Sequence, residues 1–247
     1  MENGNGNGSN NMMKLDDFIK SREGQPLVDF PVPLEELLDR FEKVTTPMVN
    51  DALRERTLVY QILPSAILPL RENFRVAGIA FTVKGSKSLA MKNDMGERVK
   101  MIESIPAHSF VVWDTNEDDE STQWGEVITM AAIKRGCRAA AVDGGIRDTD
   151  KVLEMKFPVF ARYRNSNGML GRFRITDWEI PIRIGNVNIF PGDVVFGDID
   201  GVIIVPRKIA YEVLLRAEQI RDGESELKRW VKEGMTPSEV VKRGGYF

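Results

Sequence analysis

Thiol and imidazole ligands are almost absent from this sequence of 247 residues. The single cysteine, Cys137, excludes an intramolecular disulfide framework and any cysteine-cluster zinc site. The single histidine, His108, excludes zinc and non-haem iron sites that need two or three imidazoles. A metal bound to this chain must therefore be held mainly by oxygen ligands, which favours Mg²⁺ or Mn²⁺.

Long apolar runs and an excess of one charge are also absent. No segment approaches the roughly 18 to 20 consecutive apolar residues of a membrane span. The net charge is only −3 with the signs interspersed, so no basic footprint for nucleic acid is visible. The first eleven residues, MENGNGNGSNN, lack the basic start and apolar stretch of a signal peptide. The sequence therefore predicts a cytoplasmic protein that binds neither membrane nor nucleic acid.

The Asn/Gly alternation at the N-terminus cannot contribute to a core, so residues 1–13 are predicted to be a disordered tail. The remainder, residues 14–247, shows no internal repeat and no linker, which predicts one domain. Its central part alternates strand, helix and strand, and ligand sites in such α/β regions lie where strands end and helices begin. Predicted helices cover 15–22, 34–43, 45–56, 95–105, 124–135, a start at 147 or 148, 208–234 with a break or bend near Gly223, and 237–243. Predicted strands cover 74–83, 109–113, 137–142 (followed by a turn at 143–145), 159–161, 180–184, 187–190, 193–196 and 201–205.

The segment Asp143-Gly-Gly-Ile-Arg147-Asp148 is the strongest candidate for a functional site. Two glycines after a strand would let backbone approach a ligand, and the following helix offers free N–H groups to an anion. Arg147 carries a fork of donors that suits a carboxylate, and Asp148 is a hard oxygen ligand for a cation. A helix cap and a surface ion pair would use the same residues, so the pattern alone leaves both interpretations open.

A second candidate is Trp124-Gly125-Glu126-Val127-Ile128. Gly125 permits close approach, and the amides of Val127 and Ile128 fall in the first turn of the predicted helix, where they can bind a carboxylate. Glu126 suits the positive end of a helix, which is also its purely structural explanation.

Other polar residues carry weaker signals. Lys84 and Lys87 follow a predicted strand, but no spacing marks either as a Schiff-base lysine. The remaining candidates are more typical of structural roles: His108 before a strand, the acidic loop 116–120, Arg172 and Arg174 on a β-ribbon, and Asp193, Asp198 and Asp200 in hairpin turns.

Three longer runs resemble the RraA-like family: Thr122–Asp148 (TQWGEVITMAAIKRGCRAAAVDGGIRD), Phe157–Arg162 (FPVFAR) and Pro191–Pro206 (PGDVVFGDIDGVIIVP). The early segment TTPMVNDAL at 45–53 is similar to the opening helix of that family, so the resemblance covers about residues 40–245. The family includes the 4-hydroxy-4-methyl-2-oxoglutarate / 4-carboxy-4-hydroxy-2-oxoadipate aldolases and the regulator of ribonuclease activity A. The resemblance implies an α/β fold of the three-layer β/β/α swivelling-sandwich type, assembled into trimers or hexamers with active sites between subunits.

Within the aldolase branch, the resemblance implies a divalent metal, Mg²⁺ or Mn²⁺, held largely through waters by Asp148. Glu126 would orient those waters, and Arg147 would contact the pyruvyl group of the substrate. The amides of Val127 and Ile128, next to Gly125, would receive its carboxylate. A glutamate from the C-terminal helix of a neighbouring subunit completes the family site, and Glu224 or Glu226 lies at about that place in the sequence.

The resemblance implies a pyruvate-releasing aldolase or oxaloacetate decarboxylase that acts on an anionic 4-hydroxy-2-oxo acid. Carbon–carbon cleavage beside a pyruvyl group leaves an enolate, whose charge a divalent cation stabilises as a Lewis acid. Two alternatives stay open: a non-catalytic protein-binding regulator of ribonuclease activity, and a lyase or dehydratase on a sugar-derived acid. In the regulator branch the arginine of this motif precedes a residue that cannot bind metal. The intact Arg147-Asp148 pair therefore favours the enzyme.

Overall fold

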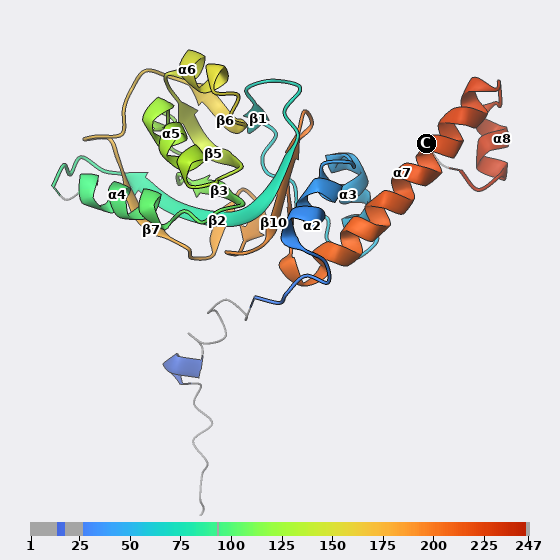
Figure 1. Ribbon diagram of the computed structural model, residues 1–247, viewed down its shortest axis with the longest axis horizontal. Helices are drawn as coiled ribbons and strands as arrows, with labels where there is room; N and C mark the ends of the chain where they lie inside the picture. Colours follow the sequence, from blue (N-terminus) through green and yellow to red (C-terminus); the bar gives the residue numbers. More distant parts are fainter. Residues whose placement is uncertain (1–13, 18–26, 93, 246–247) are drawn as a thin grey trace, which may run out of the picture.

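A computed structural model of the protein describes residues 14–17, 27–92 and 94–245 (Figure 1). Residues 15–17 are helical, and the rest of the helix predicted over 15–22 lies outside the described residues, as does the predicted tail over 1–13.

One sheet of nine strands forms the centre of the fold. Its main path runs in the order β1-β6-β5-β3-β2-β10-β11, while β4 pairs with β5 and β7 pairs with β2. The neighbours β6, β5, β3 and β2 are parallel, whereas β1, β7, β10 and β11 are added antiparallel. The strands are β1 (Leu68–Pro69), β2 (Val76–Lys87), β3 (Ser109–Asp114), β4 (Thr122–Trp124), β5 (Ala139–Ile146), β6 (Val159–Arg164), β7 (Phe173–Trp178), β10 (Val194–Asp198) and β11 (Gly201–Val205).

The sheet curls until it is nearly closed into a barrel. Ile62, just before β1, forms a bridge with Ile203 in β11, so the two ends of the sheet meet. Across the interior, Gly197 in β10 faces Phe160 in β6, where an added Cβ would lie 2.5 Å from the ring. A two-stranded sheet of β8 (Ile182–Ile184) and β9 (Val187–Ile189) contributes its apolar side chains to the same interior cluster.

Two groups of helices cover the outside of the sheet (Figure 1). The first group packs against the parallel strands through a buried cluster that includes Met101, Trp113 and Val152. The second group packs against β10 and β11 around Phe41 and Phe196, whose ring centroids are 6.2 Å apart. The first group is α4 (Asp94–Ser104), α5 (Glu126–Lys134) and α6 (Thr149–Glu154), and the second is α2 (Leu34–Phe41), α3 (Thr46–Arg54) and α7 (Ala210–Lys232). This is the single-domain α/β architecture that the sequence resemblance implied.

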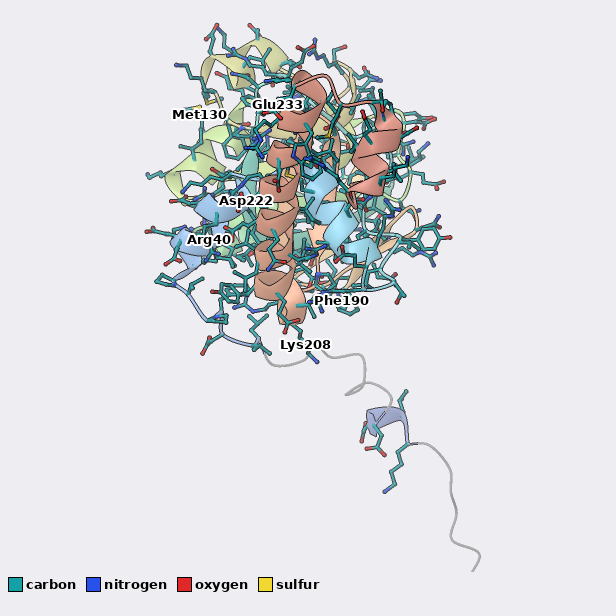
Figure 2. All side chains as sticks on the ribbon, turned by 90° about the vertical axis from the view of Figure 1, so that its right-hand side faces the viewer. Arg40, Met130, Phe190, Lys208, Asp222 and Glu233 are labelled. Atoms are coloured by element: carbon teal, nitrogen blue, oxygen red, sulfur yellow. The ribbon has the colours of Figure 1, made fainter. Side chains whose placement is uncertain are left out.

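The C-terminal helices extend away from the sheet. A short 3₁₀ turn, Arg207–Ile209, leads into α7, and α8 (Pro237–Lys242) folds back beside its end. Figure 2 views this side of the molecule and shows Lys208, Asp222 and Glu233 following one another along this helical segment. The prediction of a break near Gly223 is wrong, because α7 is one helix from Ala210 to Lys232. A glycine inside a helix costs about 1 kcal/mol, which the flanking helical turns offset.

The predicted turn at 143–145 is also wrong, since β5 continues through both glycines to Ile146. The reason is close packing: a Cβ on Gly145 would lie 2.4 Å from the Tyr163 ring and 2.9 Å from the Ser121 carbonyl oxygen. On Gly144 it would lie 2.2 Å from Gln123 Oε1. Glycine in a strand often marks such a close approach of neighbouring groups, and here the neighbour is protein rather than ligand.

Candidate active site

A pocket of about 420 Å³ opens where α4, α5 and the start of α6 meet the ends of β4 and β5. It brings together every predicted site residue that lies before α7. These lining residues are Gly125, Glu126, Val127, Ile128, Arg147 and Asp148.

The pairing of β4 with β5 places the two predicted motifs side by side. Trp124 pairs with Ile146, and the Arg147 amide donates to the Trp124 carbonyl oxygen at 3.1 Å. Gly125 then lies directly against the next two side chains, because an added Cβ would be 3.2 Å from both Arg147 Cγ and Asp148 Oδ2. The sequence run between these motifs therefore folds so that its two ends form one wall of the pocket.

The N-terminus of α5 presents free amides at this wall. The first N–H groups of a helix have no partner within the helix, and Gly125 at the N-cap has no side chain to satisfy them. The Gly125 carbonyl oxygen is held on the other side, where Thr129 Oγ1 donates to it at 2.8 Å. Trp124 Nε1 in turn donates to Thr129 Oγ1 at 2.8 Å. The amides of Val127 and Ile128 belong to this first turn, which suits an anionic ligand.

Asp148 does not cap the helix that it precedes. It is the N-cap residue of α6 in the left-handed region, with φ of 51°, and its side chain makes no capping hydrogen bond. Aspartate tolerates this conformation better than most residues. Its Oδ2 lies 3.4 Å from Arg147 Nε, with both side chains nearly half exposed. An ion pair that exposed contributes only about 0–1 kcal/mol, so neither structural explanation accounts for the pair fully.

Arg147 is held over a glycine that the sequence did not single out. An added Cβ on Gly168 would lie 2.8 Å from Arg147 Nη1, so a larger residue there would displace the guanidinium. The glycine sits in the connection between β6 and β7 and forms a bridge with Thr122 in β4. The Ser-Asn-Gly turn at 166–168 was the only signal in the sequence.

The carboxylates at the pocket suit a water-rich divalent cation. Apart from the half-exposed ion pair of Asp148 with Arg147, no side chain or amide of the described residues donates a hydrogen bond to Asp148 or Glu126, so both carboxylates keep oxygens available to a ligand. Within the described ranges no three His, Cys, Asp or Glu side chains form a cluster able to enclose a metal. Magnesium usually keeps several waters and takes one or two carboxylates, so this donor set fits Mg²⁺ or Mn²⁺ bound mainly through water.

The predicted glutamates of the C-terminal helix lie elsewhere in the same chain. Glu224 pairs with Lys228 at 2.7 Å, and Glu226 lies 3.3 Å from Arg229. Both line a separate hollow of about 560 Å³ between α7 and α8. That end of α7 points away from α5 and α6 (Figure 1), so only a neighbouring subunit could bring either glutamate to Asp148. Their role stays a prediction.

Several other candidates have structural partners. Lys87 Nζ lies 2.7 Å from Asp119, which raises the pKa of Lys87 and disfavours the neutral amine of a Schiff-base mechanism. Lys84 pairs with the buried Asp114. The acidic loop is not merely solvated: Asp118 is only 1% exposed and accepts from Gln123 Nε2 at 2.6 Å.

The later aspartates also hold the fold together. Asp198 accepts hydrogen bonds from the Thr46 amide and hydroxyl at 2.9 and 2.7 Å, which ties β10 to the start of α3. Asp193 accepts from the amides of Phe190 and Arg207 at 2.9 and 3.0 Å. These contacts support the structural interpretation of Asp193 and Asp198.

Sequence reasoning missed several lining residues, among them two whose side chains carry N–H donors. Arg98 lies on α4 and Trp113 on β3, and both reach the same pocket as Arg147. The helix pattern of 95–105 gave no reason to separate Arg98 from ordinary surface charge. Its contact with the pocket depends on how α4 packs, which only the fold shows.

The sequence over residues 46–204 matches the family described as RraA-like, Aldolase/RraA. The chain belongs to the RraA-like family. A Halalkalibacterium halodurans protein provisionally named 4-hydroxy-4-methyl-2-oxoglutarate aldolase is 28% identical over 200 residues, 81% of this chain and 90% of that one. Protein DlpA of Legionella pneumophila is 27% identical over 204 residues. The match covers 81% of this chain but only 32% of the length of DlpA. A solved structure described as novel cellulases from microbes associated with the gut ecosystem is 50% identical, with a TM-score of 0.83, over 87% of this chain and 96% of that chain.

None of the helices in the described ranges combines the length and apolar character that a bilayer crossing requires.

Proposed function

We propose that this RraA-like protein is a divalent-metal-dependent, pyruvate-releasing aldolase that also decarboxylates oxaloacetate. The observation that carries the proposal is the meeting of Arg147, Asp148 and the free amides of α5 at one pocket. The similarity to a protein provisionally named as an aldolase supports the same reaction class. The substrate would be an anionic 4-hydroxy-2-oxo acid.

The amides of Val127 and Ile128 would bind the substrate carboxylate, since they lie unpaired in the first turn of α5. Arg147 lies beside them on the same wall of the pocket and would face the adjacent keto oxygen. Retro-aldol cleavage turns that oxygen into an enolate oxygen, and a guanidinium placed beside it stabilises the new charge. One donor of this kind contributes about 3 kcal/mol to the transition state. Oxaloacetate decarboxylation reaches the same enolate, so the same arginine serves both reactions.

Asp148 would hold the divalent cation, and Glu126 at the same pocket would orient its waters. When bound, Mg²⁺ or Mn²⁺ supplies Lewis-acid stabilisation of the negative charge. Gly125 keeps the two motifs close enough for both groups to act on one ligand, because its missing side chain leaves Asp148 Oδ2 against the backbone. The neighbouring-subunit glutamate, Glu224 or Glu226, would complete the site in a trimer or hexamer.

The alternatives use fewer of these features. A purely protein-binding regulator has no need for a carboxylate left free of capping bonds in a left-handed conformation, as Asp148 is. A neutral polysaccharide, the substrate that the name cellulase implies for the 50% identical structure, gains little from an arginine beside the amides at the start of a helix. The pocket therefore favours a small anionic substrate.

The proposal is tested by offering the purified protein three substrates under matched conditions. These are oxaloacetate, 4-hydroxy-4-methyl-2-oxoglutarate and soluble cellulose, each with Mg²⁺, with Mn²⁺ and with a chelator. Pyruvate release from the oxo acids that stops with the chelator and returns with metal supports the proposal. Release of reducing sugar without pyruvate, or no turnover of any substrate, contradicts it.

A further inference from the structure

The candidate active-site pocket extends from its polar wall to a wall that is mainly apolar. Met95, Val99 and Ile102 lie on α4 at helical spacing, so these three side chains share the face that lines the pocket; together they are the α4 wall. Ile128 from α5 and Met169 from the connection between β6 and β7 add further apolar surface. A cavity of about 420 Å³ falls in the range of sites that hold drug-sized ligands, so it has room for more than a pyruvyl group.

The cation that α4 contributes to the lining, Arg98, is already neutralised. Its Nη2 lies 2.5 Å from Oδ2 of Asp94, one helical turn away, and both Nε and Nη2 are buried. The Asp94 side chain is only 2% exposed, so the pair presents no net charge to the pocket. The indole Nε1 of Trp113 is buried likewise. The charged and N–H groups on this side therefore lie beneath the apolar surface that a ligand would meet.

The uncharged polar side chains of the lining already have partners within the protein. The Thr122 hydroxyl donates to the Asn167 carbonyl oxygen at 2.7 Å. The Gln123 side chain donates to Asp118 at 2.6 Å and accepts from the Gly145 amide at 3.1 Å. These contacts leave the part of the pocket beyond Arg147 with little to hold a polar group.

The charges at the polar end match one carboxylate rather than two. With the Arg98 pair neutral, the other charged side chains of the described lining are Arg147, Glu126 and Asp148. A divalent cation and Arg147 against these two carboxylates leave one positive charge, which the carboxylate of a 2-oxo acid neutralises. A second carboxylate would be buried against the α4 wall without a counter-ion, which is costly.

We propose that the α4 wall binds an apolar substituent, so that the preferred substrate is a 4-hydroxy-2-oxo monoacid with a hydrocarbon chain beyond its hydroxyl group. This inference rests on the proposed function for the pyruvyl end and adds the chemical class of the distal end. Cleavage between C3 and C4 turns the 4-hydroxyl group into the carbonyl group of an apolar aldehyde. The hydroxyl proton leaves to a base and C3 of the enolate takes up a proton, so the reaction needs no co-reactant.

Two non-cleavable ligands of the same shape isolate the distal end. These are 2-oxoglutarate and 5-methyl-2-oxohexanoate, in which an isopropyl group replaces the distal carboxylate, and neither has the 4-hydroxyl group that retro-aldol cleavage needs. We would measure their binding by calorimetry with Mg²⁺ present. Each buried methyl-sized group contributes about fourfold to affinity, so the wild type should bind the apolar acid at least about tenfold more tightly.

Val99 is the position at which this preference can be changed with little risk to the fold, because it is 46% exposed. Val99→Lys places a cation in the α4 wall and should reverse the preference in favour of 2-oxoglutarate. Val99→Thr keeps the shape but replaces a methyl group with a hydroxyl group, and should reduce the preference to about threefold. Gly96→Lys is the matched control: it adds the same charge to α4 at an exposed residue outside the described lining, and should keep the wild-type preference.

Equal or tighter binding of 2-oxoglutarate by the wild type, or an unchanged preference in Val99→Lys, would overturn the inference. So would a loss of preference that light scattering shows to coincide with dissociation of an oligomer, because the α4 wall would then serve a neighbouring subunit. Metal-dependent pyruvate release without a preference for the apolar acid contradicts this inference alone. A Val99-dependent preference in a protein that releases no pyruvate supports the apolar subsite and contradicts the proposed reaction alone.

Discussion

At the residue scale, the backbone conformations of Arg147 and Asp148 place two neighbouring side chains differently. The Arg147 amide is tied to the Trp124 carbonyl oxygen at the end of the β4–β5 pairing, so its side chain starts from a fixed point. Asp148 then adopts the left-handed conformation that turns α6 away and leaves its carboxylate uncapped. Both residues were predicted from sequence, but the absence of capping could be seen only in the fold.

Replacing Arg147 separates a catalytic role from a structural one. We expect Arg147→Ala to lower kcat/KM for oxaloacetate by about 10²-fold or more, the scale for removing one oxyanion donor. Arg147→Lys should retain part of the turnover because it keeps the charge but loses the fork. The melting temperature of both variants should stay near that of the wild type, since the contact to Asp148 is half exposed. Normal turnover in Arg147→Ala would remove this residue from the site.

Asp143 opens the motif that contains Arg147 and Asp148, but its contacts in the fold are structural. Its carboxylate lies 3.1 Å from Arg162 Nη1, and burial raises the pKa of Asp143 to about 6. Burial likewise raises the pKa of Asp193 to about 6. Neither residue lines the pocket of Arg147, so both act on stability rather than on binding.

These two raised pKa values predict the direction of a pH effect on stability. Between about pH 4 and pH 6 the folded state keeps protons on Asp143 and Asp193 that the unfolded chain has lost. Their contribution to the free energy of unfolding is therefore fully present below pH 4 and is lost as the pH rises through about 6. Denaturant titrations at a series of pH values across this range measure the free energy of unfolding. It should decline less steeply with rising pH in Asp143→Asn and in Asp193→Asn than in the wild type. An unchanged slope in both variants would show that burial does not raise these pKa values.

At the element scale, the sequence predicted most helices and strands because their apolar spacing survives in the fold. Strand β3 and helix α5 start or end within two residues of the expected positions. The failure at the glycines of β5 has its cause in long-range packing. Strand β5 continues through Gly144 and Gly145 because Gln123 and Tyr163, which lie far along the chain, occupy the space beside them.

Dependence on tertiary packing also explains why some residues of the pocket could not be predicted from the sequence. Gly125, Arg147 and Asp148 lie in motifs with local meaning, so the sequence could single them out. Arg98 belongs to an ordinary helical pattern and reaches the pocket only through the packing of α4 against the sheet. Gly168 depends on the bridge between its loop and β4. Residues of this kind acquire a role from tertiary contacts alone.

Strand β10 offers a direct test of the near-closure of the sheet. We expect Gly197→Ala to destabilise the protein by about 1–3 kcal/mol, the usual cost of overpacking a core. The added Cβ would lie 2.5 Å from the Phe160 ring in β6 across the interior. The double variant Gly197→Ala/Phe160→Leu should recover part of that loss, because the smaller side chain makes room.

Gly223→Ala in α7 is the matched control for this substitution. Beyond the adjoining backbone of α7, no described residue lies within 4 Å of the added Cβ, and the site is helical, so alanine should stabilise the protein by about 0.5–1 kcal/mol. Denaturant unfolding of the variants measures both effects. Equal and small changes at the two glycines would contradict the described contact between β10 and β6.

At the scale of the whole molecule, the surface around the pocket suggests assembly. Apolar side chains of α4 and α5 are exposed beside it, with Met95 at 60%, Val127 at 77% and Met130 at 56%. Exposed apolar patches of this kind mark interaction sites more often than free surface. The far end of α7 extends from the body, as Figure 1 shows, and carries the glutamates proposed to complete a neighbour's site.

We therefore predict a trimer or a multiple of it, measured by light scattering of the purified protein. Met130→Glu should weaken this assembly and lower turnover with it, since burying a new charge at an interface is costly. Lys228→Glu, on the exposed far half of α7, tests separately whether that arm takes part. A fully active monomer would refute the shared site.

The central claim is that Asp148 holds a catalytic divalent cation at the pocket. It is tested most directly by metal-dependent pyruvate release from oxaloacetate in wild type, Asp148→Asn and Asp150→Asn, with binding of Mn²⁺ to each protein followed in parallel. Asp150 is the matched control. Its side chain is exposed, its contact with Lys151 is long at 4.0 Å, and it does not line the pocket. The account predicts that Asp148→Asn loses both Mn²⁺ binding and pyruvate release at an unchanged melting temperature, while Asp150→Asn keeps both. Undiminished pyruvate release by Asp148→Asn, or by the wild type freed of metal with a chelator, would contradict it.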